Sequence, residues 1–277
     1  MKKAGWSPTR RNRNLGTEKA GFGKDNRMRI PERWKDCRRY WENLSEYQST
    51  TRVVHGRTLI FVVESTRADC IHACTVDDIA AVMRMVPSEH AEDIQGIVLR
   101  QPTRKEQQLS PVWGRLGFST KIGPITGAAI VLEASTIPLT ITFGRKLSVE
   151  NLLELERLQS EADRIEDTGR EHILTFDLAA IRTVQLFRTL LHEVGHWVDY
   201  RQSVTIPSSS DADLWLPLWE KYWQRPSAER EAYAHRYSVE LATKLRNRGM
   251  IPFERMLNVD QLLQDGLPLN DFAFTVS

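Results

Sequence analysis

The sequence predicts a fold of the α+β class, and three observations support this prediction. The chain has 277 residues, of which 41% are hydrophobic, so it can bury a substantial core. Short runs typical of β-strands are concentrated in the first two thirds of the chain, and long helical patterns follow them. No apolar run is long enough to span a membrane, so we expect no membrane span.

Six segments have the composition of strands, being rich in β-branched residues or bounded by glycine and proline turns. Residues 137–144 also fit an extended connection, and residues 171–177 form the shortest candidate. The candidate strands are residues 58–66, 94–101, 111–119, 127–134, 137–144 and 171–177.

Six other segments have apolar residues at helical spacing. Thr75 is a favourable N-cap for one of them and Pro87 ends it, while Gly249 can terminate the last. The longest uninterrupted pattern begins at Asp177 and contains the residues of greatest chemical interest. The candidate helices are residues 31–47, 75–87, 148–167, 177–200, 214–225 and 226–247.

Charge is distributed unevenly along the chain. Residues 1–39 contain 13 Lys or Arg and 4 Asp or Glu, a net charge of +9. Because the net charge of the whole chain is +2, the remaining residues have a net charge of −7. Residues 1–30 therefore read as a flexible basic arm, which is a solvated tail or a candidate site for nucleic acid or an acidic partner. We expect an N-terminal subdomain with the sheet at residues 31–205 and a helical C-terminal subdomain at residues 206–277.

The predicted compartment is the cytoplasm. Three cysteines cannot all pair, which suits a reducing environment, and no apolar segment follows the lysines at the N-terminus. Export without a cleavable signal is the alternative.

The stretch HEVGHWVDY, residues 192–200, contains the most specific motif. His192 and His196 are four residues apart, so on an α-helix their imidazoles lie on the same face, one turn apart. Two nitrogens so placed can both reach one zinc ion at about 2.0–2.1 Å. Glu193 is turned aside and can act as a general base toward water. The alternative is a helix with two hydrogen-bonded or solvated histidines.

A third ligand is expected downstream, because a catalytic zinc has three protein ligands and one open position. Glu231 and His235 share one face of the helix predicted at 226–247, whereas Glu229 lies in its first turn. We predict Glu231 as the metal ligand and keep Glu229 in reserve; a solvated helix face is the alternative for Glu231. His235 then contacts the substrate or orients a ligand.

Two further residues of the motif helix have open roles. Gly195 costs about 1 kcal/mol of helix stability relative to alanine, and it either allows another backbone to approach closely or is simply tolerated. Asp199 can accept a hydrogen bond from an imidazole or a nearby backbone group, or cap donors near the helix end.

HEVGH followed by REAYA resembles the gluzincin branch of the zincin metallopeptidases. HEVGHWVDY is also similar to the HExGHxxD form of the anthrax lethal factor group, and the resemblance extends over residues 178–238. It implies a zincin-like domain with a small mixed sheet, an active-site helix, a helical C-terminal subdomain and a bound Zn²⁺. It also implies that an edge strand, residues 113–118 or 127–133, pairs with an extended substrate.

The family's oxyanion stabiliser is a Tyr or His from the downstream part of the domain. Tyr233 and His235 are our catalytic candidates beside Glu193, and Tyr222 and Tyr237 stay open. The residues Trp215, Trp219 and Trp223 follow at helical spacing, which favours core packing over a specificity wall beside the cleft.

The expected function is that of a zinc metalloendopeptidase acting on a protein or peptide substrate, with His192, His196 and Glu231 as metal ligands. The first alternative is a zincin-like regulator that binds nucleic acid or a protein partner with little or no proteolysis. The second is an interaction module without a metal.

Overall fold

The computed structural model describes residues 39–109 and 112–274. By their internal contacts the residues divide into two units, Met1–Arg39 and Tyr40–Ser277, of which the second holds the elements that follow. The basic arm predicted at residues 1–30, with its candidate nucleic-acid or acidic partner, lies outside the described residues, and so do residues 31–38 of the first candidate helix.

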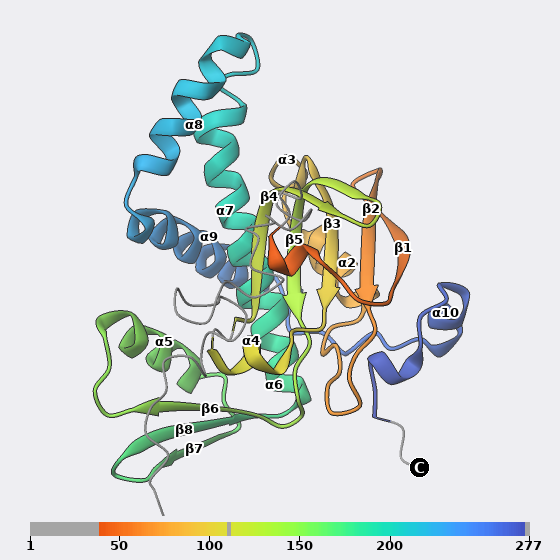
Figure 1. Cartoon of the computed structure of the whole chain (residues 1–277), viewed down its shortest axis with the longest axis vertical. Coiled ribbons are helices and arrows are strands. Elements are labelled where there is room, and N and C mark those ends of the chain that lie inside the picture. The colour runs from red at the N-terminus through yellow and green to blue at the C-terminus, as the bar shows by residue number, and fades with distance from the viewer. Residues whose placement is uncertain (1–38, 110–111, 275–277) are drawn as a thin grey trace, which may run out of the picture. The chain divides into compact units, whose positions relative to one another are not determined.

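The main sheet has five strands in the order β1-β2-β3-β5-β4 (Figure 1). The three inner strands are parallel to one another, and each outer strand pairs antiparallel with its neighbour. The sheet is therefore mixed, and β4 forms one of its two edges. Its strands are β1 (Tyr47–Val54), β2 (Arg57–Glu64), β3 (Ile94–Arg100), β4 (Gly114–Ile122) and β5 (Ile125–Glu133).

A tight turn at His55 and Gly56 joins β1 to β2. Both residues have positive φ, +50° and +73°, as a type I′ hairpin turn requires, and glycine adopts this conformation without steric cost. β1 is mostly exposed, whereas β2 and β3 are almost continuously buried. The hairpin therefore covers one edge of a buried parallel core.

Both faces of the sheet are buried. On one face, Phe61, Ile97 and Ile130 pack against a helical layer that includes α2 (Val76–Met85) and the long central helix. On the other face, Val62 and Val131 pack beneath Trp41 of the 3₁₀ turn η2 (Tyr40–Glu42). α2 begins at a capping box formed by Thr75 and Asp78, as the sequence indicated for its N-terminus.

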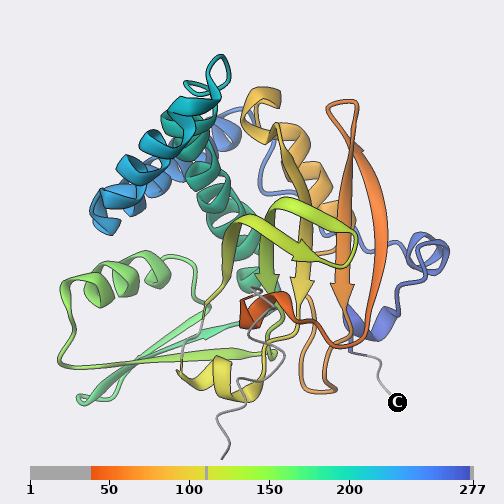
Figure 2. The same cartoon turned by 45° about the horizontal axis from the view of Figure 1, so that its top comes forward.

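A smaller antiparallel sheet lies below the main one in Figures 1 and 2, with the order β6-β8-β7. Its hydrophobic cluster includes Leu155, Leu158, Leu174 and Phe176, contributed by α5 and β8. The bounds of these elements are β6 (Leu139–Gly144), α5 (Val149–Gln159), β7 (Arg164–Asp167) and β8 (Glu171–Phe176).

The long central helix contains the histidine motif and is not α-helical throughout. It begins at α6 (Leu178–Val184), where Asp177 caps the N-terminus by accepting a hydrogen bond from the Ala180 amide. It continues through the π-helical segment η3 (Gln185–Leu190), α7 (Leu191–Tyr200) and a second π-helical segment, η4 (Arg201–Thr205). π-Helical turns are rare and occur often at functional sites.

The rest of the chain is helical and returns to the sheet. α8 projects from the body beside the end of the central helix, and α9 crosses α7 (Figures 1 and 2). The remaining elements are α3 (Ser88–Ala91), α4 (Arg104–Leu109), η5 (Ala212–Leu214), α8 (Trp215–Gln224), α9 (Ser227–Asn247), α10 (Val259–Gln264) and η6 (Leu269–Asp271).

The α+β class and all six candidate strands are confirmed, with shifted ends. Two helix predictions are wrong in part. In the described part of the segment 31–47 only the 3₁₀ turn Tyr40–Glu42 is helical, and Tyr47 already belongs to β1, while the segment 148–167 ends its helix at Gln159 before β7 begins. Residues 127–133 are not an edge strand, because β5 lies between β3 and β4. No described helix combines the length and apolar character needed to cross a bilayer.

A buried ion pair links the first part of the fold to the last. The carboxylate of Asp78 on α2 accepts two hydrogen bonds from the Arg182 guanidinium on α6, at 3.0 and 2.8 Å, and one from the Met256 amide at 2.9 Å. Asp78 is fully buried. Removal of either charge would leave its partner unpaired away from water.

We predict that Asp78→Ala lowers the free energy of unfolding by about 3–5 kcal/mol, because Arg182 would remain buried without its counter-charge. The exposed Asp260 in the first turn of α10 provides the control, and Asp260→Ala should change the value by less than about 0.5 kcal/mol. Urea unfolding of both variants measures the difference; equal midpoints would contradict the role given to Asp78.

Candidate metal centre

Close packing of α7 against α9 sets the position of the candidate site. A Cβ added to Gly195 would lie 3.0 Å from the Ala234 Cα and 3.1 Å from the Ala234 carbonyl oxygen. Only glycine permits this approach without displacement of α9. The expectation that Gly195 allows another backbone to come close is therefore confirmed.

This approach brings Glu231 of α9 to both histidines of α7. The His192 Nε2 atom lies 3.2 Å from Glu231 Oε2, and the His196 Nε2 atom lies 3.5 Å from Glu231 Oε1. The two imidazole rings are adjacent, with centroids 4.6 Å apart. Each carboxylate oxygen therefore faces a different imidazole.

The two spacings between Glu231 and the imidazoles fit a zinc ion. Two ligands that each lie about 2.0–2.1 Å from a tetrahedral zinc are about 3.4 Å from one another. The observed nitrogen-to-oxygen distances of 3.2 and 3.5 Å fall on either side of that value. The donor set of two imidazoles and one carboxylate is also one that zinc accepts.

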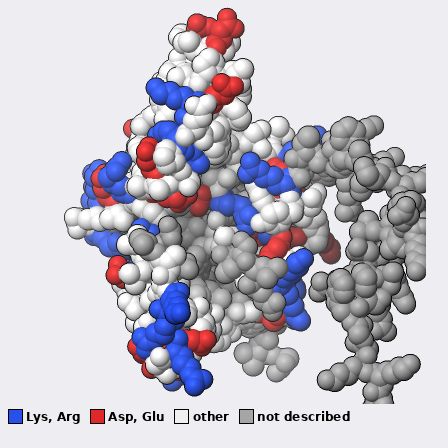
Figure 3. Space-filling view, turned by 60° about the vertical axis from the view of Figure 1, so that its left-hand side comes forward, with Lys and Arg blue, Asp and Glu red and all other residues white. Residues whose placement is uncertain are grey.

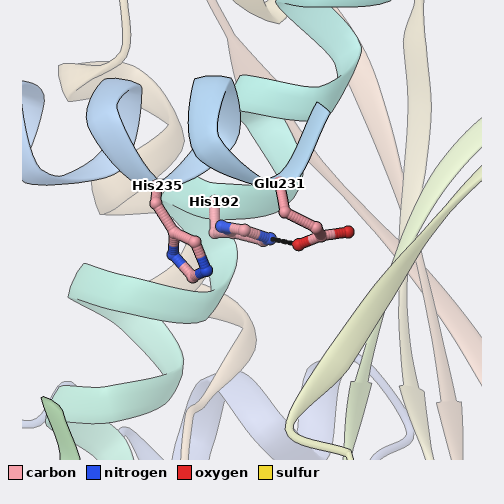
Figure 4. A group of neighbouring side chains, drawn as sticks. All are labelled: His192, Glu231 and His235. Atoms are coloured by element: carbon pink, nitrogen blue, oxygen red, sulfur yellow. Dashed lines mark ion pairs between the residues drawn. The ribbon is translucent and has the colours of Figure 1, made fainter. Parts of the chain in front are cut away.

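His235 lies on the other side of His192. Figure 4 shows His192 between Glu231 and His235, which project together from α9. Ligand atoms of these three residues all lie within 4.8 Å of one another, and among the described residues this group, which does not include His196, is the one that meets that spacing. The Arg157 Nη1 atom donates a hydrogen bond of 3.0 Å to His235 Nε2 and so engages that lone pair. Arg157 thus favours His196 over His235 as the histidine that binds the metal together with His192 and Glu231.

The electrostatics around these histidines favour the charged form of the Glu231 carboxylate. Hydrogen bonds with His192 and His196 hold the pKa of Glu231 far below its usual value. Burial opposes the charged form of His196, but the hydrogen bond with Glu231 and the nearby carboxylates raise the pKa of His196 above its usual value. Burial, with the charges of His192 and Arg157, lowers the pKa of His235 to about 4, so His235 is neutral at pH 7.

Glu193 lies between the motif helix and the sheet. Its side chain is buried, and burial raises its pKa. The nearby histidines and a hydrogen bond from the Leu116 backbone lower the pKa and so oppose this effect. Leu116 belongs to β4. The candidate general base is therefore held against the edge strand.

A cleft of about 440 Å³ opens beside these residues. One wall is the edge strand β4 and the other is formed by α7, α8 and the first turn of α9. The lining includes His192, Glu193, His196 and Glu231 together with Val112, Gly114, Arg115, Leu116, Phe118, Tyr222, Trp223 and Arg230. Three candidate ligands and the candidate base thus face one space beside a free strand edge.

Several predicted residues lie elsewhere. Tyr233 donates a hydrogen bond to Gln202 on η4 and does not line the cleft, so it is poorly placed for the catalytic role predicted for it. Tyr237 contacts His90. The reserve ligand Glu229 is exposed and away from the cluster. Asp199 forms an ion pair with Arg225 at the junction of α8 and α9 and accepts a hydrogen bond of 3.4 Å from the Ser203 hydroxyl, so it binds donors near the helix end rather than orienting an imidazole.

The tryptophan row was only partly understood from the sequence. Trp215 and Trp219 are 43% and 37% exposed, so the prediction that they pack in the core is wrong. Trp223 lines the cleft and contacts Phe118, with ring centroids 5.3 Å apart. Phe118 and Arg230 were missed as cleft residues, although Arg230 directly precedes Glu231. Arg157 belongs to no recognisable motif, so its contact with His235 could not have been predicted from the sequence.

No protein-family model matches the chain, and no curated protein and no solved structure is detectably similar to it. The site must therefore be interpreted from its own geometry.

We predict that zinc affinity falls as the pH decreases, and that the fall begins above pH 6.5. The metal must displace a proton from His196, whose pKa lies above the usual value of 6.5, so affinity is full above that raised pKa and is lost below it. The slope is about tenfold per pH unit for each proton displaced. Competition with a chelator of known affinity between pH 5.5 and 8.5 measures the zinc affinity. A zinc affinity that does not change down to pH 6 would contradict the assignment of His196 as a metal ligand.

Proposed function

We propose that the protein is a zinc-dependent metallopeptidase that cleaves peptide bonds within an extended polypeptide. The observation that carries the proposal is the convergence of His192, His196 and Glu231 beside a buried Glu193, in a cleft that has a free strand edge as one wall. The resemblance of HEVGH and REAYA to the gluzincins, which involves the same residues, agrees with this proposal.

The proposed chemistry is metal-assisted hydrolysis. His192, His196 and Glu231 hold the zinc, which when bound polarises the substrate carbonyl and lowers the pKa of water to about 7. Glu193 accepts a proton from the attacking water and delivers it to the departing amine. Its burial raises its pKa, which makes the protonated intermediate state of the carboxyl easier to reach.

The substrate is proposed to bind as an additional strand along β4. The backbone edge of β4 is not paired with any other described strand, and it borders the cleft. Main-chain hydrogen bonds would then align the scissile carbonyl near Glu193. Residues 40–277 carry 25 basic and 32 acidic residues, and on the face in Figure 3 both charges are interspersed, which favours a polypeptide over a polyanion.

Tyr222 is the best-placed candidate for stabilising the oxyanion. Its side chain is 1% exposed and lines the cleft, and its buried hydroxyl forms no well-oriented hydrogen bond within the described residues, with the Arg225 guanidinium beside it. Burial raises its pKa, so the hydroxyl keeps its proton and can donate it in a hydrogen bond. His235 is neutral at pH 7 and flanks the opposite side of His192.

We predict that Glu193→Gln keeps one zinc per chain and loses at least about a thousandfold in kcat, because proton transfer would have no base. His196→Ala should lose the zinc as well, while His235→Ala should retain it. Metal analysis of purified protein and proteomic cleavage profiling measure both properties. Unchanged cleavage by Glu193→Gln would end the proposed mechanism, and a metal-free wild type would favour an interaction module.

We also predict that Tyr222→Phe lowers kcat by about 10²–10³-fold with little change in KM, since the lost hydrogen bond forms mainly in the transition state. The ring contacts with Tyr200 and Phe118 survive in this variant, so the melting temperature should be unchanged. Tyr233→Phe is the matched control, because its hydroxyl binds Gln202 outside the cleft. Equal kcat values for the two variants would exclude Tyr222 from this role.

A further inference from the structure

A second, larger cavity lies beside the metal cleft. Its volume is about 720 Å³, which is within the usual range for ligand-binding sites. Its walls come from the ends of β3 and β5, the start of β4, the strand β6 and the helices α4 and α5. None of the residues proposed above for metal binding or catalysis lines it.

The cavity runs along the edge of β6. All six residues of β6, Leu139–Gly144, line it. Leu139, Ile141 and Phe143 also pack on the hydrophobic cluster of the small sheet, whereas the residues between them are exposed on the opposite face. Residues from both faces of a strand can border one cavity only if that cavity lies along the strand's edge.

This edge is open for pairing. In the order β6-β8-β7, β6 pairs with β8 on one side, and no strand among residues 39–109 and 112–274 pairs with its other side. In an antiparallel pair, alternate residues direct their N–H and C=O groups away from the partner strand. β6 therefore presents a row of main-chain donors and acceptors to the cavity, which is the usual template for strand addition.

The cavity and the metal cleft are adjacent. Val112 and Arg115, at the start of β4, line both. Arg115 is held in place there: its Nη2 atom donates to Glu133 at 3.1 Å and its Nη1 atom donates to the Tyr40 hydroxyl at 3.0 Å. The cleft and the cavity therefore share a border at the start of β4.

Charged groups in the cavity wall are largely neutralised by one another. Arg100 donates to both oxygens of Glu133, each at 3.1 Å, and to both oxygens of Glu106, at 3.0 and 2.9 Å. Glu133 also accepts from Arg115. This network offers little excess charge to a free ion, so the open main-chain edge of β6 is the stronger recognition element.

We propose that this cavity is an extension of the substrate site, in which an extended polypeptide that has crossed the metal centre along β4 adds as a strand to β6. The inference rests on the proposed function, because it assigns the occupant of the cavity from its continuity with the cleft. The substrate class is then an unfolded or extended segment of protein that is longer than the cleft itself. Short peptides would fill the cleft alone.

Hydrogen exchange of the zinc-loaded Glu193→Gln variant tests the proposal, with reduced and carboxymethylated α-lactalbumin as an unfolded probe and a blocked tetrapeptide as the short probe. We expect the unfolded protein to slow amide exchange in residues 114–118 and 139–144, and the tetrapeptide to slow it in residues 114–118 alone. Slower exchange in 114–118 without a change in 139–144 overturns the inference and leaves the proposed function standing. No change in either segment overturns the inference, while cleavage profiling against Glu193→Gln decides the function separately.

A proline pair provides the kinetic test. Thr142→Pro removes one main-chain donor from β6, and Ile165→Pro does the same on β7, the opposite edge of the same sheet. We expect Thr142→Pro to raise KM for the unfolded protein about three- to tenfold and to leave tetrapeptide hydrolysis unchanged. Ile165→Pro should change neither, and equal KM values for the two variants overturn the inference. If Thr142→Pro melts well below Ile165→Pro, hydrogen exchange at the unsubstituted β6 decides the question.

Discussion

The approach of α9 to α7 at Gly195 is the constraint on which the candidate site depends. Two histidines on one helix face form half of a metal site by themselves, and the other half must come from an element that is distant in sequence. Because Ala234 lies against Gly195, Glu231 reaches both imidazoles. The buried ion pair between Asp199 and Arg225 fixes the start of α9 from the other end of the motif helix.

The same packing explains the charge balance of the site. Glu231 is half-exposed and strongly favours its charged form, while Glu193, one residue from His192, is buried, and this burial raises its pKa above the usual value. Two carboxylates within one cleft are thus driven in opposite directions by their surroundings, as a ligand and a proton acceptor require. Arg157 adds a third influence, because it engages His235 and leaves His192 and His196 to face Glu231.

The sequence was most informative where periodicity and burial coincide. The central helix, the buried strands β2, β3 and β5 and the pairing of His192 with Glu231 were accessible from spacing alone. β1 and β7 were missed because their side chains are mostly exposed, and an exposed edge strand has no apolar alternation to detect. Trp215 and Trp219 were misjudged because apolar spacing shows which residues share a helix face but not whether another element covers it. Tyr222 could not be singled out, since the role proposed for it depends on the burial of its hydroxyl beside the cleft, which only coordinates reveal.

The π-helical segment η3 ends two residues before His192. A π-helical turn contains about one residue more than an α-helical turn, and each residue of a regular helix rotates the chain by about 100°. The wider turn between Val184 and Leu191 therefore accommodates one residue more than a regular helix with the same total rotation would. Loss of a single residue there would restore a regular helix and leave the imidazoles facing Glu231, whereas loss of a residue from an α-helical turn before His192 would rotate the motif by about 100° relative to the part of the helix that packs on the small sheet.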